Sequence, residues 1–423
     1  MTLRLRIVPS KAEGSVLSSP SKSYTHRAMT LALLAEGESV LRRPLLGEDT
    51  LATLDAVKAF GAKVTKDDAL RITGGTLRCP DNVIDTRNSG TTIRLMAGVA
   101  SLLPCVTVLT GDDSVRRRPM QPLIDALGRM GVRCESTRGN GMAPLVVKGP
   151  NLGNRTEIRG DVSSQFISSL LISSALKEVD TEIVMTTPLK SRPYVDITME
   201  MMARFGASCR STSEGFFVDG GQRYRPRDYT VPGDFSSAAF PLAAGALTGK
   251  VTVRNLDPKD AQGDRAFLDI LRSLGARVEW NGDALTCSTA ELHATDIDLG
   301  DAPDLFPMAA VMCAFAEGES RIYNASHVRL KESDRISATA MFLRDMGADM
   351  VEKEDGCVIN GGRPLHGAKV NSFNDHRILM AAAIAALRAS GETMISDGDC
   401  HRISYPDFVS DMRSLGAKME MIP

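Results

Sequence analysis

A short pattern of residues recurs six times along the chain. Each copy has apolar residues seven, four and one positions before a glycine, and an alternating stretch after it; the glycines are Gly61, Gly131, Gly206, Gly275, Gly347 and Gly416. Apolar residues at this spacing lie on one face of a helix, and glycine is favoured just after a helix ends. The alternating stretch is typical of a strand. Successive glycines are 70, 75, 69, 72 and 69 residues apart, which predicts a repeated helix–strand unit of nearly constant size.

A second feature precedes each copy. It is a small polar cluster, here called a knot; the knots are residues 21–23, 88–91, 163–165, 233–236, 302–304 and 374–377. One residue of each knot lies 38 to 43 residues before the glycine: Ser23, Ser89, Ser164, Ser236, Asp304 and Asp375. Each knot opens a segment that is apolar nearly all round, which predicts a buried helix. Two features that repeat in step predict six copies of an α/β unit, each with two helices and about four strands.

The knots allow two interpretations. Ser, Asn and Asp are common helix N-caps, so each knot could simply cap its helix. Helix N-termini also carry unpaired N–H groups and partial positive charge, so several of them together would bind an anion. Cations within or beside the knots favour the second interpretation: Lys22, Arg27, Arg94, Arg118 and Arg377.

A further charged run at residues 329–335 has the same ambiguity. Helical spacing would place Lys331 and Arg335 on one face, with Glu332 beside them. Such a run is commonly a solvated helix face with local ion pairs. The alternative is a clamp in which Lys and Arg hold phosphate or carboxylate.

Size and composition exclude several classes of protein. The 423 residues predict two or three domains, and the net charge of −2 disfavours nucleic acid as the main partner. The longest apolar runs, residues 306–316 and 378–387, are about half the length of roughly 20 residues that a membrane span needs. Residues 1–6 lack the apolar core of a signal peptide and are expected to form a strand.

Known catalytic and metal motifs are missing from the sequence. No two of the eight cysteines have CxxC spacing, and their dispersed, often apolar-flanked positions indicate a protein of the reducing cytosol. There is no HExxH motif, and the six histidines are scattered, so we expect no metal. The chain also lacks a P-loop, a strand-linked GxGxxG and a GxSxG elbow, which argues against nucleotidases, dinucleotide enzymes and serine hydrolases.

The motifs, taken together in their order, resemble the EPSP synthase family of enolpyruvyltransferases. They run from residue 20 to about residue 408: Pro20-Ser21-Lys22-Ser23 with Arg27, Asn88-Ser89-Gly90-Thr91-Thr92-Ile93-Arg94, Leu109-Thr110-Gly111 with Arg118-Pro119, Ser163-Ser164-Gln165-Phe166, Gly233-Asp234-Phe235-Ser236-Ser237-Ala238, Lys331-Glu332-Ser333-Asp334-Arg335 and Asn374-Asp375-His376-Arg377. The family's α/β fold also has six repeats, three in each of two globular domains, with buried helices as in an inside-out barrel. The resemblance implies domains of residues 20–231 and 232–423, the second including strand 1–19, with the active site in the cleft between them.

The resemblance also implies an activity. The family transfers the enolpyruvyl group of phosphoenolpyruvate to the 5-hydroxyl of shikimate 3-phosphate and releases phosphate, a step of the shikimate pathway to aromatic amino acids that glyphosate inhibits. The two substrates carry about five to six negative charges, and burying them requires cations and N–H donors such as those of the knots. We expect a cytoplasmic, monomeric enzyme that uses no cofactor and has no nucleic-acid or membrane partner.

By resemblance, each candidate residue has a role. Catalysis is expected from Asp304 as the base, assisted by Lys331, from Glu332 as the acid that protonates the methylene carbon, and from Lys22. The residues expected to bind shikimate 3-phosphate are Lys22, Ser23, Arg27, Ser163, Ser164, Gln165, Ser191, Asp304, His327 and Lys331. Those expected to bind phosphoenolpyruvate are Lys22, Gly90, Arg118, Gln165, Arg335 and Arg377. From the residues alone, Asp304 could instead cap the helix through residues 306–316.

Two positions differ from the family pattern. His327 stands where many relatives carry Asn, and either side chain can hydrogen-bond a hydroxyl. Ile403 stands where relatives often carry a lysine, which puts one carboxylate contact in doubt. If residues 401–405 are extended, His401 lies on the same face as Ile403 and could supply the charge near or below its pKa.

Two other functions remain open. The first is a UDP-N-acetylglucosamine 1-carboxyvinyltransferase, which has the same fold but usually a reactive cysteine in the loop corresponding to residues 112–118, where this chain has none. The second is a non-catalytic ring of α/β repeats around DNA, whose basic residues would line a broad surface instead of clustering in knots.

Overall fold

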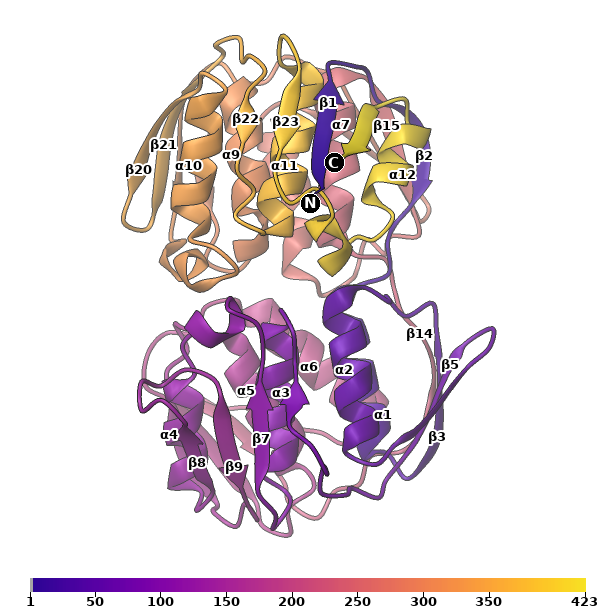
Figure 1. Cartoon of the computed structure of the whole chain (residues 1–423), viewed down its shortest axis with the longest axis vertical. Helices are drawn as coiled ribbons and strands as arrows, with labels where there is room; N and C mark the ends of the chain where they lie inside the picture. Colours follow the sequence, from indigo (N-terminus) through magenta and orange to yellow (C-terminus); the bar gives the residue numbers. More distant parts are fainter. Residues whose placement is uncertain (1–2) are drawn as a thin grey trace. The chain divides into compact units, whose positions relative to one another are not determined.

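The computed structural model describes residues 3–423, in which 24 strands form six four-stranded sheets beside 12 α-helices (Figure 1). The chain forms two compact units. One is Lys22–Val231, and the other is Pro232–Pro423 together with the residues up to Ser21. They are called here the Lys22 unit and the Pro232 unit, and each contains three sheets and six of the α-helices.

The three sheets of the Lys22 unit share one plan. Their strand orders are β14-β3-β5-β4, β6-β7-β9-β8 and β10-β11-β13-β12, and in each the first two strands are parallel and the others antiparallel. The strands are β3 (Gly37–Arg42), β4 (Lys63–Lys66), β5 (Leu70–Gly74), β6 (Ile84–Asp85), β7 (Thr107–Thr110), β8 (Arg133–Ser136), β9 (Leu145–Lys148), β10 (Arg155–Ile158), β11 (Thr181–Met185), β12 (Arg210–Ser211), β13 (Gly215–Val218) and β14 (Asp228–Thr230).

The Pro232 unit repeats this plan with help from the start of the chain. Its strand orders are β2-β15-β17-β16, β18-β19-β21-β20 and β22-β23-β1-β24. The predicted N-terminal strand is β1, apart from residues 1 and 2, which lie outside the described residues. The strands are β1 (Arg4–Val8), β2 (Glu13–Leu17), β15 (Lys250–Arg254), β16 (Arg277–Asn281), β17 (Ala284–Ser288), β18 (Ile297–Asp298), β19 (Gly318–Tyr323), β20 (Asp349–Lys353), β21 (Gly356–Gly361), β22 (Lys369–Val370), β23 (Thr393–Ile395) and β24 (Lys418–Ile422).

The helices alternate between two kinds. Those that begin at the knots are buried almost all round: α1 (Lys22–Leu34), α3 (Gly90–Ala100), α5 (Ser164–Ser174), α7 (Phe235–Thr248), α9 (Phe306–Phe315) and α11 (His376–Arg388). The others have one buried face and precede the repeated glycines: α2 (Glu48–Ala59), α4 (Gln121–Arg129), α6 (Arg192–Arg204), α8 (Phe267–Ser273), α10 (Arg335–Asp345) and α12 (Phe408–Ser414). No helix within residues 3–423 has the length and apolar character needed to cross a membrane.

The repeated glycines end their helices as the sequence predicts. All six have φ between 85° and 107°, a region that favours glycine because it has no Cβ. A strand begins two residues after five of these glycines, as β4 does after Gly61, and four residues after Gly206. The six predicted α/β units, with their buried helices, are therefore confirmed.

In the Pro232 unit, the three buried helices α7, α9 and α11 all contact one another. The sheets lie outside them, so each buried helix is enclosed on every side (Figure 1). In the Lys22 unit, α3 contacts both α1 and α5 in the same way. Because enclosed helices can present polar groups only at their ends, the knots are the natural places for chemistry in each unit.

One pair of cysteines differs from what a protein of the reducing cytosol, where disulfides are rare, is expected to show. Cys79, in the loop after β5, forms a disulfide with Cys105, in the loop after α3. Among the described residues the other six cysteines are free. The 26 residues that separate the pair give no sign of the bond, because it is the fold that brings the two loops together.

We expect the disulfide to stabilise the Lys22 unit. Cys79→Ser should lower its free energy of unfolding by up to about 3 kcal/mol without reductant, because a cross-link of this loop length restricts the unfolded chain. Urea unfolding with and without dithiothreitol measures the effect, and Cys209→Ser, which changes a free and partly buried thiol, is the matched control. Equal stability of oxidised wild type and Cys79→Ser would show that the bond does not stabilise the unit.

Candidate active site

In the Pro232 unit, three cations converge on the carboxylate of Asp304. Arg335 Nη1 lies 2.8 Å from Oδ1, Arg377 Nη2 lies 2.9 Å from Oδ2, and Lys331 Nζ lies 3.6 Å from Oδ1. Arg335 is the first residue of α10, and Arg377 is in the first turn of α11. Asp304 lies in the short 3-10 helix Pro303–Leu305, directly before α9. The starts of three helices therefore build this cluster.

The cations control the charge of Asp304, whose side chain is 18% exposed. Burial alone would raise its pKa, but attraction to Arg377, Lys331 and Arg335 outweighs burial and holds the pKa of Asp304 well below its usual range. Asp304 is therefore ionised at neutral pH. It is a weak base as long as the three cations surround it.

Two further carboxylates complete the cluster around Arg335, which is 1% exposed. Its Nε lies 2.9 Å from Oδ2 of Asp375, and its Nη2 lies 2.7 Å from Oε2 of Glu332. Asp375 is fully buried and also caps α11 by accepting from the backbone N–H of Arg377 at 2.9 Å. Burial disfavours the charge of Arg335, yet the attraction of Asp375, Glu332 and Asp304 raises the pKa of Arg335. Three cations thus face three carboxylates.

A fourth carboxyl group, Asp264, is buried near this cluster. It accepts a hydrogen bond from the hydroxyl of Ser236. Burial and the repulsion of Asp304 raise the pKa of Asp264 to about 6, against the attraction of Arg377. Asp264 was not among the predicted residues, and nothing in its sequence neighbourhood marks it.

The structure corrects three interpretations of this region. Lys331 and Arg335 do not share a helix face, because Lys331 is extended and α10 begins only at Arg335. The segment is not a solvated helix face, because Arg335 is buried. Asp304 does not cap α9, whose N-cap is Leu305 without a side-chain bond. A loop, and not helical spacing, brings Lys331 to Asp304.

In the Lys22 unit, Lys22 and Gly90 stand at the starts of α1 and α3. Lys22 Nζ lies 3.0 Å from Oδ2 of Asp49, a buried residue of α2 that the sequence analysis missed. A Cβ added at Gly90 would lie 2.5 Å from Nη1 of Arg118 and 3.4 Å from Nη1 of Arg94. An alanine at this position would therefore have to displace the guanidinium of Arg118, the end of a flexible side chain.

Gln165 joins the starts of α3 and α5. Its Oε1 accepts from Nη1 of Arg94 at 2.6 Å, and its Nε2 donates to the hydroxyl of Thr91 at 2.8 Å. Arg94 is buried. The sequence marks Arg94 only as a cation of the knots, and the structure shows that it holds Gln165 in place.

The three predicted serines also lie at helix starts. Ser163 caps α5 by accepting from the N–H of Gln165 at 3.3 Å, and Ser164 is the first residue of that helix. Ser191 precedes α6 with φ 56°, a left-handed conformation, and its side chain makes no cap bond. Non-glycine residues in this conformation are uncommon and cluster at functional sites. The serines therefore stand where helix N–H groups can bind an anion.

Arg27 is 2% exposed, and its guanidinium meets only uncharged oxygen atoms among the described residues. These belong to Thr198 (Oγ1, 2.7 Å), Tyr194 (carbonyl, 2.8 Å), Ser23 (carbonyl, 3.0 Å) and Ser168 (Oγ, 3.3 Å). Burial lowers the pKa of Arg27 to about 10, so the group is still charged at neutral pH. Arg27 therefore fastens α1 to α5 and α6 while carrying a charge that a nearby anion would stabilise.

The role predicted for His327 stays a prediction, whereas the structure contradicts the role predicted for His401. His327 is buried in the 3-10 helix Ser326–Leu330 of the Pro232 unit, the same unit as Asp304. The expectation for His401 is wrong, because residues Cys400–Ile403 form a 3-10 helix instead of an extended segment. Burial lowers the pKa of His401, and its Nδ1 lies 3.0 Å from the carbonyl of Tyr405. His401 is therefore uncharged at neutral pH and cannot replace a lysine at Ile403.

Comparison with known proteins gives consistent results. The sequence model of the family described as EPSP synthase (3-phosphoshikimate 1-carboxyvinyltransferase) matches residues 8–412. A 3-phosphoshikimate 1-carboxyvinyltransferase of Methanocorpusculum labreanum is 52% identical over 421 residues, 99% of each chain, and one of Methanocaldococcus jannaschii is 46% identical over 418 residues, 97% of each. An EPSP synthase structure from Acinetobacter baumannii has a TM-score of 0.82 at 28% identity over 100% of both chains. An enolpyruvyl transferase from Streptomyces tendae has the same fold, with a TM-score of 0.83 at 19% identity over 100% of this chain and 99% of that one.

The ion cluster predicts a large effect of one substitution. Asp375→Asn keeps the shape of the side chain but removes a buried charge beside Arg335, which should cost about 3–5 kcal/mol of stability. Asp349→Asn is the matched control, because Asp349 pairs with Arg363 at 3.1 Å and both are exposed, so the loss should stay within about 1 kcal/mol. Urea unfolding at pH 7 compares them. An equal loss in the two variants would contradict the importance assigned to Asp375.

Proposed function

The chain belongs to the EPSP synthase family, and we propose from this premise that it transfers the enolpyruvyl group of phosphoenolpyruvate to the 5-hydroxyl of shikimate 3-phosphate, releasing phosphate. The observation that carries the proposal is the convergence of Lys331, Arg335 and Arg377 on the carboxylate of Asp304. A reaction between two anions needs such cations, and a hydroxyl nucleophile needs a base beside them.

In our proposal, most of the residues that bind shikimate 3-phosphate belong to the Lys22 unit. Ser163, Ser164 and Ser191 bind its phosphate at the starts of α5 and α6, where helix N–H groups and partial positive charge favour an anion. The rest of the molecule contacts Lys22, Ser23, Arg27 and Gln165. In the Pro232 unit, Asp304, His327 and Lys331 are the residues proposed for this substrate.

In our proposal, phosphoenolpyruvate binds the two arginines that pair with the carboxylate of Asp304 in the structure. We assign it Arg335 and Arg377 from the Pro232 unit, and from the Lys22 unit Gly90, Arg118, Gln165 and Lys22. When its phosphate and carboxylate pair with Arg335 and Arg377, Asp304 loses part of the attraction that lowers its pKa. The pKa of Asp304 then rises, and the carboxylate becomes a stronger base. Binding of the second substrate therefore activates the base.

The chemical steps follow from these positions. Asp304, assisted by Lys331, takes the proton of the 5-hydroxyl as its oxygen attacks C2 of phosphoenolpyruvate. Glu332, which must first take up a proton from solvent when phosphoenolpyruvate replaces it beside Arg335, donates that proton to the methylene carbon, which becomes a methyl group, and a tetrahedral ketal forms. Withdrawal of a proton from that methyl group then expels phosphate and restores the double bond in the product. Side-chain acids and bases supply every proton transfer in this scheme, so we propose an enzyme that uses no metal or cofactor. We further propose that it acts as a monomer in the cytoplasm.

The alternatives have less support. The loop of residues 112–118 contains the 3-10 helix Val115–Arg117 and no cysteine, which disfavours the UDP-N-acetylglucosamine enzyme. A ring around DNA would expose its cations, whereas Arg27, Arg94, Arg118, Arg335 and Arg377 are all buried.

Phosphate release on mixing the two substrates tests the proposed function. Wild type should release one phosphate per enolpyruvyl group transferred. Asp304→Asn should lower turnover roughly 10²–10⁴-fold, the usual range for losing a general base, with the affinity for shikimate 3-phosphate changed only a few-fold. Release with UDP-N-acetylglucosamine and not with shikimate 3-phosphate would overturn the substrate assignment, and wild-type turnover in Asp304→Asn would overturn the role of Asp304.

A second prediction concerns Gly90. Gly90→Ala should displace the Arg118 guanidinium, and it should raise the KM for phosphoenolpyruvate about 10- to 100-fold by weakening a charge-assisted bond. Shikimate 3-phosphate affinity should stay within about threefold. Combining Gly90→Ala with Arg118→Ala should be no worse than Arg118→Ala alone, because both remove one interaction.

Gly128→Ala is the matched control for this comparison, since a Cβ at Gly128 would meet nothing within 4 Å. Its kinetics should match wild type. Fully additive losses in the Gly90→Ala and Arg118→Ala double variant would mean that Gly90 acts independently of Arg118.

A further inference from the structure

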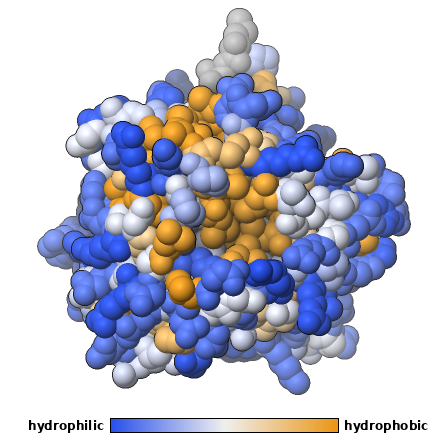
Figure 2. Space-filling view, turned by 90° about the horizontal axis from the view of Figure 1, so that it is seen from below, coloured by the Kyte–Doolittle hydropathy of each residue, from blue (hydrophilic) through white to orange (hydrophobic). Residues whose placement is uncertain are grey.

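The Lys22 unit has an apolar pocket at the opposite end of its buried helices from the knots. Its walls include Leu102, just after α3 ends, and Leu176, just after α5 ends. Helix α3 has 11 residues, so this end is about 16 Å from the knots. Figure 2 looks at this end and shows apolar surface gathered around a hollow. The pocket holds about 340 Å³, near the lower limit for small-molecule sites, roughly 300 Å³.

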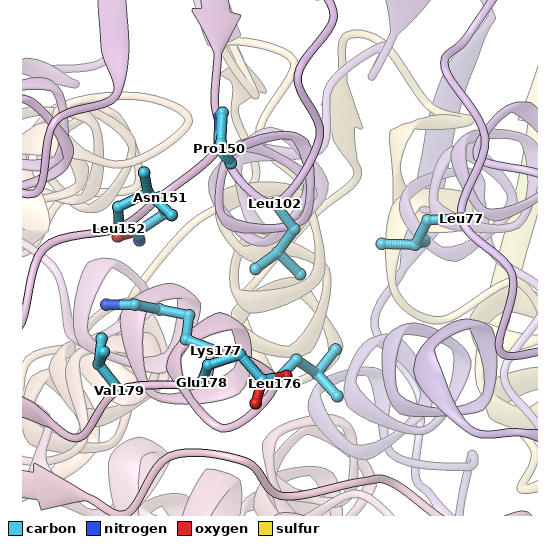
Figure 3. Close-up of a pocket in the computed structure, with 9 residues that line it drawn as sticks. All are labelled: Leu77, Leu102, Pro150, Asn151, Leu152, Leu176, Lys177, Glu178 and Val179. Carbon is cyan, nitrogen blue, oxygen red and sulfur yellow. The ribbon is translucent and has the colours of Figure 1, made fainter.

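The pocket has six apolar residues and an enclosed polar side. Figure 3 shows Asn151 and the ammonium end of Lys177 on one side, with Leu102 and Leu77 reaching in from others. The Cys79–Cys105 disulfide joins the two loops that carry Leu77 and Leu102. The apolar residues are Leu77, Leu102, Pro150, Leu152, Leu176 and Val179.

Lys177 brings an unbalanced charge to the pocket. It is 5% exposed, and its Nζ donates to the carbonyl of Gly153 and to the hydroxyl of Thr181 at 3.0 Å, with Sδ of Met130 at 4.0 Å. All of these are uncharged, and no acid pairs with Lys177 within residues 3–423. Glu178, which also lines the pocket, pairs with Arg223 at 3.4 Å instead. Burial lowers the pKa of Lys177 to about 8, so most of the group is still charged at pH 7. These bonds explain how Lys177 links its own loop to the loop that contains Gly153, but none of them supplies a negative charge to balance the ammonium group.

Asn151 brings an unused acceptor. It is 4% exposed, and its Nδ2 meets only Sδ of Met130 at 3.8 Å. Its Oδ1 is buried and has no hydrogen-bond partner among the described residues. A buried amide oxygen without a partner costs free energy. The role of Lys177 as a link between loops does not account for it, so the Asn151 oxygen points to a missing donor.

We propose that this pocket binds a small bicyclic aromatic molecule that carries one N–H or O–H group. The apolar walls accept the ring, and the N–H or O–H group donates to Oδ1 of Asn151. The electron-rich face of the ring compensates the ammonium of Lys177 through a cation–π contact. The volume equals about eleven water molecules at ~30 Å³ each, which suits two fused rings. A carboxylate would pair with Lys177, but it would bring a second acceptor to the Asn151 oxygen.

Ligand-observed NMR titration of the full chain tests the proposal with a matched pair of probes. Indole carries the required N–H, and 1-methylindole has the same ring system without it. Indole should bind wild type about tenfold more tightly, since the methylated probe leaves the buried oxygen unpaired. In Asn151→Ala, the two probes should bind with nearly equal affinity. Equal binding of the two probes to wild type, or no binding of either, would overturn the proposal.

Two further arms locate the site and its ligand class. Leu102→Trp should fill the pocket and abolish indole binding, whereas Val351→Trp, at an exposed apolar residue of β20 in the other unit, should leave it unchanged. Indole binding that survives in a folded Leu102→Trp protein would refute the location. Benzoate binding more tightly than indole would show an anion site at Lys177 instead. If Leu102→Trp does not fold, the comparison of wild type with Asn151→Ala still decides.

Discussion

A helix enclosed on every side can offer polar groups only at its ends, and this constraint organises the whole molecule. All residues of α3 are buried, and its neighbours α1 and α5 are nearly so. The candidate catalytic and binding groups therefore gather where such helices begin, as Lys22, Gly90 and Ser164 do. Just beyond the other ends of α3 and α5, Leu102 and Leu176 line an apolar pocket. One packing rule thus separates charged chemistry from apolar binding within a unit.

The features that sequence could predict are those set by local physics. A glycine that must adopt positive φ after a helix marks its end wherever it stands, and Gly61 and Gly416 show the rule at both ends of the chain. The same holds for the caps, because Ser163 and Asp375 bond to N–H groups only two residues away. Each glycine or cap alone is weak evidence for a helix boundary, but their sixfold recurrence predicts the repeated α/β unit. The family resemblance then supplied the activity, which no local rule contains.

The features that sequence could not predict depend on partners brought together by the fold. Asp49 pairs with Lys22 from another helix. The negative charge of Asp304, 40 residues away in the sequence, raises the pKa of Asp264. At Asp304, the preference of aspartate for helix caps points to the wrong role, because three distant cations outweigh it. The prediction for His401 assumed an extended segment, whereas residues Cys400–Ile403 form a 3-10 helix in which burial lowers the pKa of the ring.

The carboxylate of Asp304 pairs with Arg335 and Arg377, so it occupies positions that an anionic ligand would otherwise take. Any small anion in solution has to compete with a carboxylate that is tethered beside these arginines and so is always present at high local concentration. Ambient phosphate, which offers no further contacts, is at a disadvantage in this exchange. A ligand with both a phosphate and a carboxylate can replace several contacts at once. Because Asp304 competes for Arg335 and Arg377, the site selects ligands by their shape and number of charges, and not by negative charge alone.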